Sequence, residues 1–294
     1  MERREEMLPH DANGVAPMNA YYDKDGFTLY NGDCVSVMSE MEPNSVDVVI
    51  TSPPYGTCRS ETFSKESNQK RKYNMRYDEF VEDRTPDEYC TWTVDVFNAI
   101  DRVLNDNRII LYNFGLGNDG HTEYTNYDWF NTVKHIIAGT PFTIADVLVW
   151  KKKAALPNNT SSNKSTRICE PVIVFCRKTE MMTFPSNKKV INHFDTGQNL
   201  YSPFYNIFEA KNNDGSCELN KATFSTQFVD KLIDLYVPDG QKGEWTVFDP
   251  FSGTGTTGIS AIGKGMRYIG IELSAQQCEY TVSRLSSGVQ LELF

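Results

Sequence analysis

A five-residue run, residues 51–55 (Thr-Ser-Pro-Pro-Tyr), combines hydrogen-bond acceptors, an aromatic ring and a stiff backbone. It follows the segment 47–50 (Asp-Val-Val-Ile), whose three apolar residues are typical of a strand buried on both faces. Two consecutive prolines cannot continue a central strand, because neither has an N–H group for the ladder. We therefore expect the chain to leave a sheet here, at the carboxyl edge where α/β folds bind their ligands.

The side chains of this turn suit the alkylation of an exocyclic amino group. The exocyclic nitrogen of cytosine or adenine is a weak nucleophile, because its lone pair is delocalised into the ring. The Ser52 hydroxyl and the Pro53 carbonyl can each accept an N–H hydrogen bond, which favours the pyramidal nitrogen of the transition state. The Tyr55 ring can stack against an extruded base. Such a site needs only a methyl donor held in line, without a metal or a covalent intermediate.

A second motif, residues 247–257, reads as a strand, a glycine-rich turn and the start of a helix. Glycines let the backbone approach a ligand, and a helix N-terminus favours negative charge. The next expected strand ends at Glu272, about twenty residues further on, where a carboxylate can accept both hydroxyls of a ribose. The motif lacks the lysine of a nucleotide triphosphatase loop. It also lacks the third glycine of a dinucleotide-binding site. The spacing therefore predicts a site for an adenosine-containing cofactor.

Together these motifs resemble those of the amino-group DNA methyltransferases that use S-adenosylmethionine, in the permuted order often called the beta class. In that order the Ser/Asp-Pro-Pro-Tyr/Phe turn precedes the cofactor turn, as it does here. Residues 30–34 resemble the family's strand-end Gly-Asp, and residues 150–151 with 169–175 resemble its Trp-x-Lys and His-Glu strand pair, with cysteine in place of histidine. Residues 220–225 resemble its His-Pro-x-x-x-Pro element but differ at three positions.

The resemblance implies S-adenosyl-L-methionine as cofactor and double-stranded DNA as substrate, with a cognate restriction endonuclease as one possible partner. It implies a catalytic set made of Ser52, Pro53, Pro54 and Tyr55. It implies a cofactor-binding set made of Asp33, Cys34, Thr51, Phe224, Asp249, Pro250, Phe251, Gly253, Gly255, Thr256 and Glu272. No metal is expected, because the seven cysteines form no Cys-x-x-Cys pair and the four histidines are scattered.

Short apolar runs alternate with helical patterns along the chain, which predicts an α/β fold with a doubly wound, mostly parallel sheet. The resemblance implies a circularly permuted, Rossmann-like methyltransferase sheet. We expect seven strands, at residues 27–30, 47–51, 108–113, 144–150, 171–176, 245–249 and 267–272. We expect helices at residues 85–104, 226–236, 256–263 and 274–286.

Four regions are expected along the chain. Residues 1–20 form a loosely ordered lead-in, residues 21–178 the catalytic half of the methyltransferase domain, and residues 220–294 its cofactor-binding half. Residues 179–219 are rich in asparagine, lysine and aromatic residues and have poor periodicity, so we expect an insertion that is not part of the sheet. The family keeps its target-recognition segment at this place.

The net charge of −10 argues against binding of nucleic acid by bulk charge. A local basic face is still expected from loop lysines and arginines, at residues 65–76, 151–153, 164–167 and 188–189. No apolar run is long enough for a membrane helix, and the charged N-terminus is unlike a secretory signal. The cysteines show no regular spacing, which is typical of proteins in a reducing cytoplasm. The sequence leaves open whether the protein is a monomer or a dimer.

Several alternatives remain. Serine at the head of the turn favours the N4 amino group of cytosine, with adenine N6 as the alternative within the class. Methylation at carbon 5 of cytosine is disfavoured, because the chain has no Pro-Cys pair. Protein or RNA methyltransferases with an Asn-Pro-Pro-Tyr turn usually carry the cofactor motif first. A nicotinamide-dependent oxidoreductase could use the glycine turn and Glu272, and a catalytically silent DNA-binding module could keep the fold; neither explains the Ser-Pro-Pro-Tyr turn.

Overall fold

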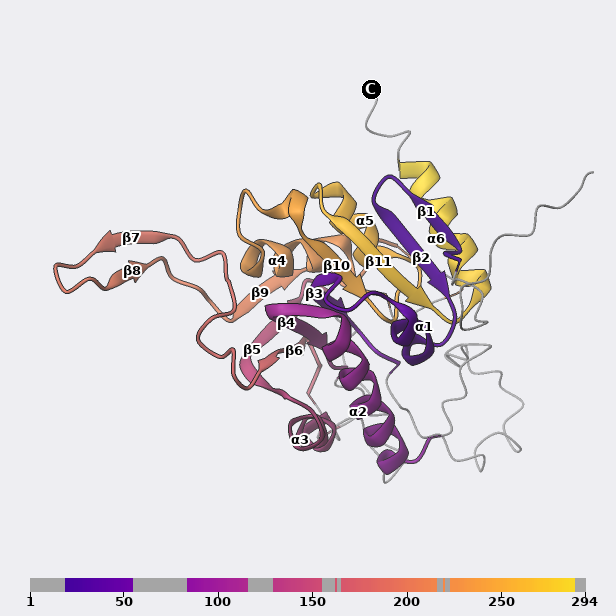
Figure 1. Cartoon of the computed structure of the whole chain (residues 1–294), viewed down its shortest axis with the longest axis horizontal. Coiled ribbons are helices and arrows are strands. Elements are labelled where there is room, and N and C mark those ends of the chain that lie inside the picture. Colours follow the sequence, from indigo (N-terminus) through magenta and orange to yellow (C-terminus); the bar gives the residue numbers. More distant parts are fainter. Residues whose placement is uncertain are drawn as a thin grey trace, which may run out of the picture.

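The computed structural model describes residues 19–54, 84–115, 129–154, 162, 165–215, 219 and 223–288 (Figure 1). The strands are β1 (Tyr22–Lys24), β2 (Phe27–Asn31), β3 (Val46–Thr51), β4 (Leu104–Asn113), β5 (Phe142–Lys152), β6 (Cys169–Arg177), β7 (Val190–His193), β8 (Asn199–Tyr201), β9 (Ile207–Ala210), β10 (Thr246–Asp249) and β11 (Arg267–Glu272). The helices are α1 (Cys34–Glu40), α2 (Pro86–Val103), α3 (Trp129–Gly139), α4 (Thr226–Tyr236), α5 (Thr256–Gly263) and α6 (Ala275–Gly288), with a short 3₁₀ turn, η3 (Lys242–Glu244).

A nine-stranded sheet in the order β1-β2-β11-β10-β3-β4-β6-β5-β9 forms the centre of the molecule. Seven of its strands run parallel, while β1 and β6 run in the opposite direction. The mostly parallel α/β fold is thus confirmed, and all seven expected strands are present. The expected number of seven is wrong, because β1 and β9 extend the two edges. Both are short and largely exposed, so they lack the continuous apolar run that marks an inner strand.

Helices cover both faces of this sheet, as expected for a doubly wound fold (Figure 1). Alternate residues of a strand point to opposite faces. On β4, Ile109 and Leu111 pack in a core with α4, α5 and α6, whereas Ile110 and Tyr112 pack in a second core with α1, α2 and α3. Burial on both faces explains why the inner strands are apolar throughout, and it leaves the strand ends as the place for polar chemistry.

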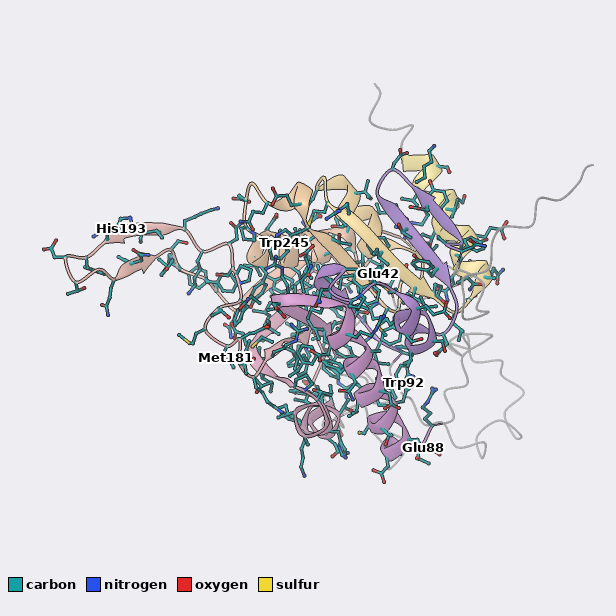
Figure 2. The ribbon with its side chains drawn as sticks, in the orientation of Figure 1. Glu42, Glu88, Trp92, Met181, His193 and Trp245 are labelled. Carbon is teal, nitrogen blue, oxygen red and sulfur yellow. The ribbon has the colours of Figure 1, made fainter. Side chains whose placement is uncertain are left out.

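Residues 178–189 lie at the amino edge of the parallel strands. Because β6 is reversed, it ends there: Arg177 Nε donates to Asp101 Oδ1 at 2.6 Å, and the Arg177 guanidinium also donates to the backbone carbonyl of Leu104 at 2.7 Å. Further along, Asn187 N donates to the Leu235 carbonyl at the end of α4 at 2.9 Å. The β7–β8 ribbon then projects from the body of the protein, with His193 near its outer end (Figure 2). The side chains of both strands are exposed to solvent.

The chain then returns to the sheet as β9, which pairs in parallel with β5 from Ile207↔Val149 to Ala210↔Lys152. The expectation that residues 179–219 lie outside the sheet is therefore wrong for β9 and holds for the ribbon. The residues after β9 reach the carboxyl edge, where Ala154 N donates to Asn212 Oδ1 at 3.4 Å. Within the described residues, no helix is long and apolar enough to cross a membrane.

Candidate active site

The Ser-Pro-Pro turn begins where β3 ends, at the carboxyl edge of the sheet. All six residues of β3 are buried between β10 and β4, which fixes the point at which the chain emerges. Ser52 Oγ donates to Asn113 Oδ1 at 3.4 Å, and Asn113 Nδ2 donates to the Pro171 carbonyl at 3.2 Å. The second bond sets the orientation of the amide. Because the Ser52 hydroxyl donates its one proton to Asn113, its oxygen can only accept a hydrogen bond from a further N–H group.

A buried carboxylate, Asp249, connects this turn to the glycine-rich turn. Its Oδ1 accepts from Thr51 Oγ1 at 2.6 Å and from Phe251 N at 3.0 Å, and its Oδ2 accepts from Thr257 Oγ1 at 2.7 Å. Burial raises the pKa of Asp249 to about 6 against the opposing effect of these hydrogen bonds. The last residue of β3 and the last residue of β10 are therefore held together inside the protein, so the two motifs form one unit.

The glycine-rich turn places a carboxylate and two backbone N–H groups together. Gly253 N donates to Glu272 Oε2 and Ser274 N donates to Glu272 Oε1, each at 2.8 Å. Gly255 has φ +78° at the N-cap of α5, and a Cβ there would lie 2.3 Å from Thr281 Cγ2. Only glycine fits this position, both for its backbone conformation and for its packing.

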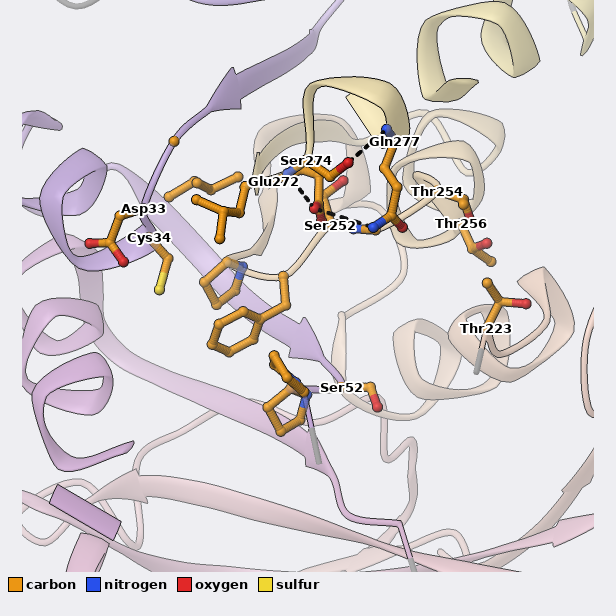
Figure 3. Close-up of a pocket in the computed structure, with 18 of the residues that line it drawn as sticks. Asp33, Cys34, Ser52, Thr223, Ser252, Thr254, Thr256, Glu272, Ser274 and Gln277 are labelled. Atoms are coloured by element: carbon orange, nitrogen blue, oxygen red, sulfur yellow. Dashed lines mark hydrogen bonds between the residues drawn. The ribbon is translucent and has the colours of Figure 1, made fainter. Parts of the chain in front are cut away.

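A single pocket runs from this turn to the Ser-Pro-Pro turn (Figure 3). Eleven of the predicted residues line it: Asp33, Cys34, Ser52, Pro53, Pro54, Phe224, Pro250, Phe251, Gly253, Thr256 and Glu272. Three others do not line it, because Thr51 and Asp249 are buried behind the turns and Gly255 packs against α6. Tyr55 lies outside the described residues. The two motifs thus share one pocket.

Other pocket residues were not predicted from the sequence: Gly32, Trp92, Thr223, Ser252, Thr254, Ile271, Leu273, Ser274 and Gln277. Most are direct neighbours of the predicted residues, so a wider window around each motif would have found them. Trp92 comes from α2 and belongs to no motif. Its ring lies 5.5 Å from that of Phe251, and together they give the pocket an apolar wall.

Asp33 and Cys34 form another part of the wall, at the start of α1. Asp33 Oδ1 accepts from Ser36 N at 2.9 Å, so this acid caps the helix besides lining the pocket. Burial raises the pKa of the Cys34 thiol to about 12. Cys34 therefore stays protonated at neutral pH and contributes a small apolar surface.

Part of the expected basic face is paired with acidic residues in the part of the chain that the structure describes. Lys151 Nζ lies 2.7 Å from Glu209, Lys152 pairs with Glu170, and Lys189 Nζ lies 2.8 Å from Asp239. Residues 65–76 and Lys164 lie outside the described residues. Among the described residues, no group of three or more His, Cys, Asp or Glu could hold a metal ion.

Comparison with known proteins gives a consistent result. A family model described as DNA methylase matches residues 46–283. The type II methyltransferase M.HinfI of Haemophilus influenzae is 24% identical over 270 residues, which cover 88% of this chain and 68% of the relative. The type II methyltransferase M2.MboI of Moraxella bovis is 23% identical over 290 residues, which cover 90% of both chains.

Solved structures share the fold. The PvuII DNA methyltransferase (cytosine-N4-specific) matches with a TM-score of 0.65 and 17% identity, covering 90% of this chain and 88% of that one. The complex of M1.HpyAVI with SAM matches with a TM-score of 0.54 and 15% identity, covering 88% of this chain and 99% of that one.

Proposed function

This chain belongs to the N6/N4 DNA methylase family, and from that premise we propose that it transfers a methyl group from S-adenosyl-L-methionine to the N4 amino group of cytosine in DNA. The observation that carries the proposal is the single pocket lined by both the Ser-Pro-Pro turn and the glycine-rich turn. A donor held by one turn would lie beside an amino group held by the other. The cofactor itself follows from the family, whose structural neighbours include a complex with SAM.

The pocket residues fit this cofactor. Each Glu272 oxygen accepts one backbone N–H, and Oε1 also accepts from Gln277 Nε2 at 3.5 Å. A carboxylate has about four lone-pair sites, so it can accept a ribose hydroxyl besides these donors. The rings of Phe251 and Trp92 and the neutral thiol of Cys34 suit the adenine and the carbon chain. When bound, S-adenosylmethionine supplies an electrophilic methyl group on a sulfonium.

The residues of the turn then act on the target amino group. Ser52 Oγ, with its proton directed at Asn113, accepts one N–H of the amino group, and the Pro53 carbonyl accepts the other. Both contacts strengthen as the nitrogen becomes pyramidal and gains positive charge, so they stabilise the transition state more than the ground state. The rings fix both proline φ angles, so only the ψ angles remain as backbone torsions by which this turn could change its geometry.

Cytosine N4 is the preferred target because a serine hydroxyl, and not a carboxylate, heads the turn. The PvuII DNA methyltransferase, which is cytosine-N4-specific, has a similar fold. The alternative is the N6 amino group of adenine, with the same contacts. Mass spectrometry of nucleosides from DNA incubated with the protein and S-adenosylmethionine decides between them. N4-methylcytosine is the expected product; N6-methyladenine would replace the cytosine assignment, and unmodified DNA would refute the methyltransferase proposal.

We also propose that, of residues 179–219, those that follow β9 recognise the target sequence in DNA. The support is the placement of residues 211–215 at the carboxyl edge, beside Ala154, whereas the β7–β8 ribbon starts from the amino edge. The six residues of β3 separate the two edges by about 20 Å. Exchanging residues 211–219 with those of a relative should change the methylated sequence, and replacing residues 190–201 by a two-residue turn should not. The reverse outcome would assign recognition to the ribbon.

A further inference from the structure

A tyrosine on α2 contacts the catalytic turn from outside both sequence motifs. Tyr89 Oη donates a hydrogen bond to the carbonyl oxygen of Pro54 at 2.9 Å. Pro54 has no side-chain donor or acceptor and no N–H group, so its backbone carbonyl is its one hydrogen-bonding group. We propose that Tyr89 is a positioning residue that sets the geometry of the Ser-Pro-Pro turn, an assignment that rests on the proposed methyl transfer.

The tyrosine is itself firmly held. A capping box begins α2, in which Thr85 N donates to Glu88 Oε2 at 2.8 Å and Glu88 N donates to Thr85 Oγ1 at 3.3 Å. Tyr89 N then donates to the Thr85 carbonyl at 2.9 Å. Two turns further along α2, fully buried Val96 and Phe97 anchor the helix in the core. The phenol therefore approaches Pro54 from a fixed backbone.

The same helical turn also forms part of the donor pocket. The Tyr89 ring lies 5.6 Å from the ring of Trp92, which lines the pocket and lies 5.5 Å from the ring of Phe251. One rigid segment of α2 thus contacts the catalytic turn through Tyr89 and the donor wall through Trp92. It fixes the relative position of the two reacting groups, for which small displacements are costly.

Occupying the Pro54 carbonyl also selects the acceptors that the target meets. An amino group has two N–H donors, and in-line attack requires both acceptors to lie on the side away from the methyl donor. The bond from Tyr89 fixes the direction of the Pro54 carbonyl, and the two N–H groups of the target are then assigned to Ser52 Oγ and the Pro53 carbonyl. Without the phenol, the turn can rotate and the Pro54 carbonyl competes for the same N–H groups.

The contact can be observed without any activity. Residues 54–55 are the only Pro-Tyr pair in the sequence, so labelling with proline carbonyl ¹³C and tyrosine ¹⁵N gives one amide-to-carbonyl NMR signal. Tyr89→Phe should move its ¹³C shift upfield, because the carbonyl loses a hydrogen bond. The control Tyr21→Phe removes the hydroxyl of an exposed tyrosine and should leave the signal in place. An unmoved signal in Tyr89→Phe would overturn the proposed contact.

The role is tested by kinetics. Tyr89→Phe should lower kcat by about fivefold to tenfold, while the KM for DNA and the Kd for S-adenosylmethionine stay unchanged. In a Ser52→Ala background the same substitution should have almost no further effect, since Tyr89 acts through the alignment of that turn. An unchanged kcat, or an equal loss in both backgrounds, would overturn the positioning role. Wild-type protein that methylates no DNA would refute the proposed function and this role with it, while the NMR signal would still report on the contact.

Discussion

Replacing Asp249 by asparagine tests how the two turns are joined. The carboxylate is completely enclosed, and burial of a charge is unfavourable unless hydrogen bonds compensate it. Its three donors, the hydroxyls of Thr51 and Thr257 and the N–H of Phe251, compensate only in part, because burial still raises the pKa of Asp249 from 3.8 to about 6. An asparagine has a similar shape, keeps an acceptor for Thr51 and does not titrate.

The sign of the pH effect follows from the direction of the shift. Between pH 3.8 and about 6, the folded protein keeps a proton on Asp249 that the unfolded chain has lost, so the free energy of unfolding falls as the pH rises through this window. At 1.36 kcal/mol per pKa unit, the full loss is about 3 kcal/mol, of which about 2 kcal/mol falls between pH 4.5 and 7.5. The Asp249→Asn variant is free of this loss.

Urea unfolding followed by circular dichroism, at several pH values from 4.5 to 7.5, measures the effect. The free energy of unfolding of Asp249→Asn minus that of the wild type should rise by about 2 kcal/mol over this range, since other titrating groups cancel in the difference. Asp95→Asn, at an exposed position of α2, is the control and should show a constant difference. A constant or falling difference for Asp249→Asn would refute the raised pKa and the buried link built on it.

Three further substitutions test the separate parts of the pocket. Ser52→Ala should lower kcat by about 100-fold and leave the Kd for S-adenosylmethionine in calorimetry unchanged, because the hydroxyl acts on the base; weakened donor binding would contradict this role. Gly255→Ala should reduce the free energy of unfolding in urea by about 2–4 kcal/mol, because the new methyl group meets Thr281 at a positive φ; a wild-type value would show that the turn adapts. Glu272→Gln should raise the Kd for the donor about tenfold, because an amide cannot accept from both flanking N–H groups; unchanged affinity would remove Glu272 from the cofactor site.

The positions of the Ser-Pro-Pro turn and the glycine-rich turn could be predicted from the sequence because each one directly follows a strand that is buried on both faces. In β3 and β10 every residue is buried, so the apolar run ends where the chain leaves the sheet. The polar residues directly after such a run lie at the sheet edge whatever the rest of the fold does. This is why Ser52, Phe251 and Gly253, from two different motifs, line one pocket.

The elements that were missed are those in which packing outweighs local preference. Helix α3 (Trp129–Gly139) contains aromatic and β-branched residues that favour strands, and its packing against α2 and β5 makes it helical. Strand β9 (Ile207–Ala210) is only four residues long and has one buried residue, so its sequence carries no strand signal. Tyr89 and Trp92 reach the site from the side of a helix, at a distance in sequence that no motif covers.

Strand direction is a further property that composition does not reveal. The apolar run of β6 is the same whether it lies parallel or antiparallel to β4, yet its reversal sends residues 178–189 to the amino edge. A segment expected to form one recognition unit is thereby divided between the two edges. Similarly, the sequence does not reveal that Thr51 and Asp249, both expected to bind the cofactor, bond to each other 198 positions apart. A change at either residue should therefore disturb both the Ser-Pro-Pro turn and the glycine-rich turn.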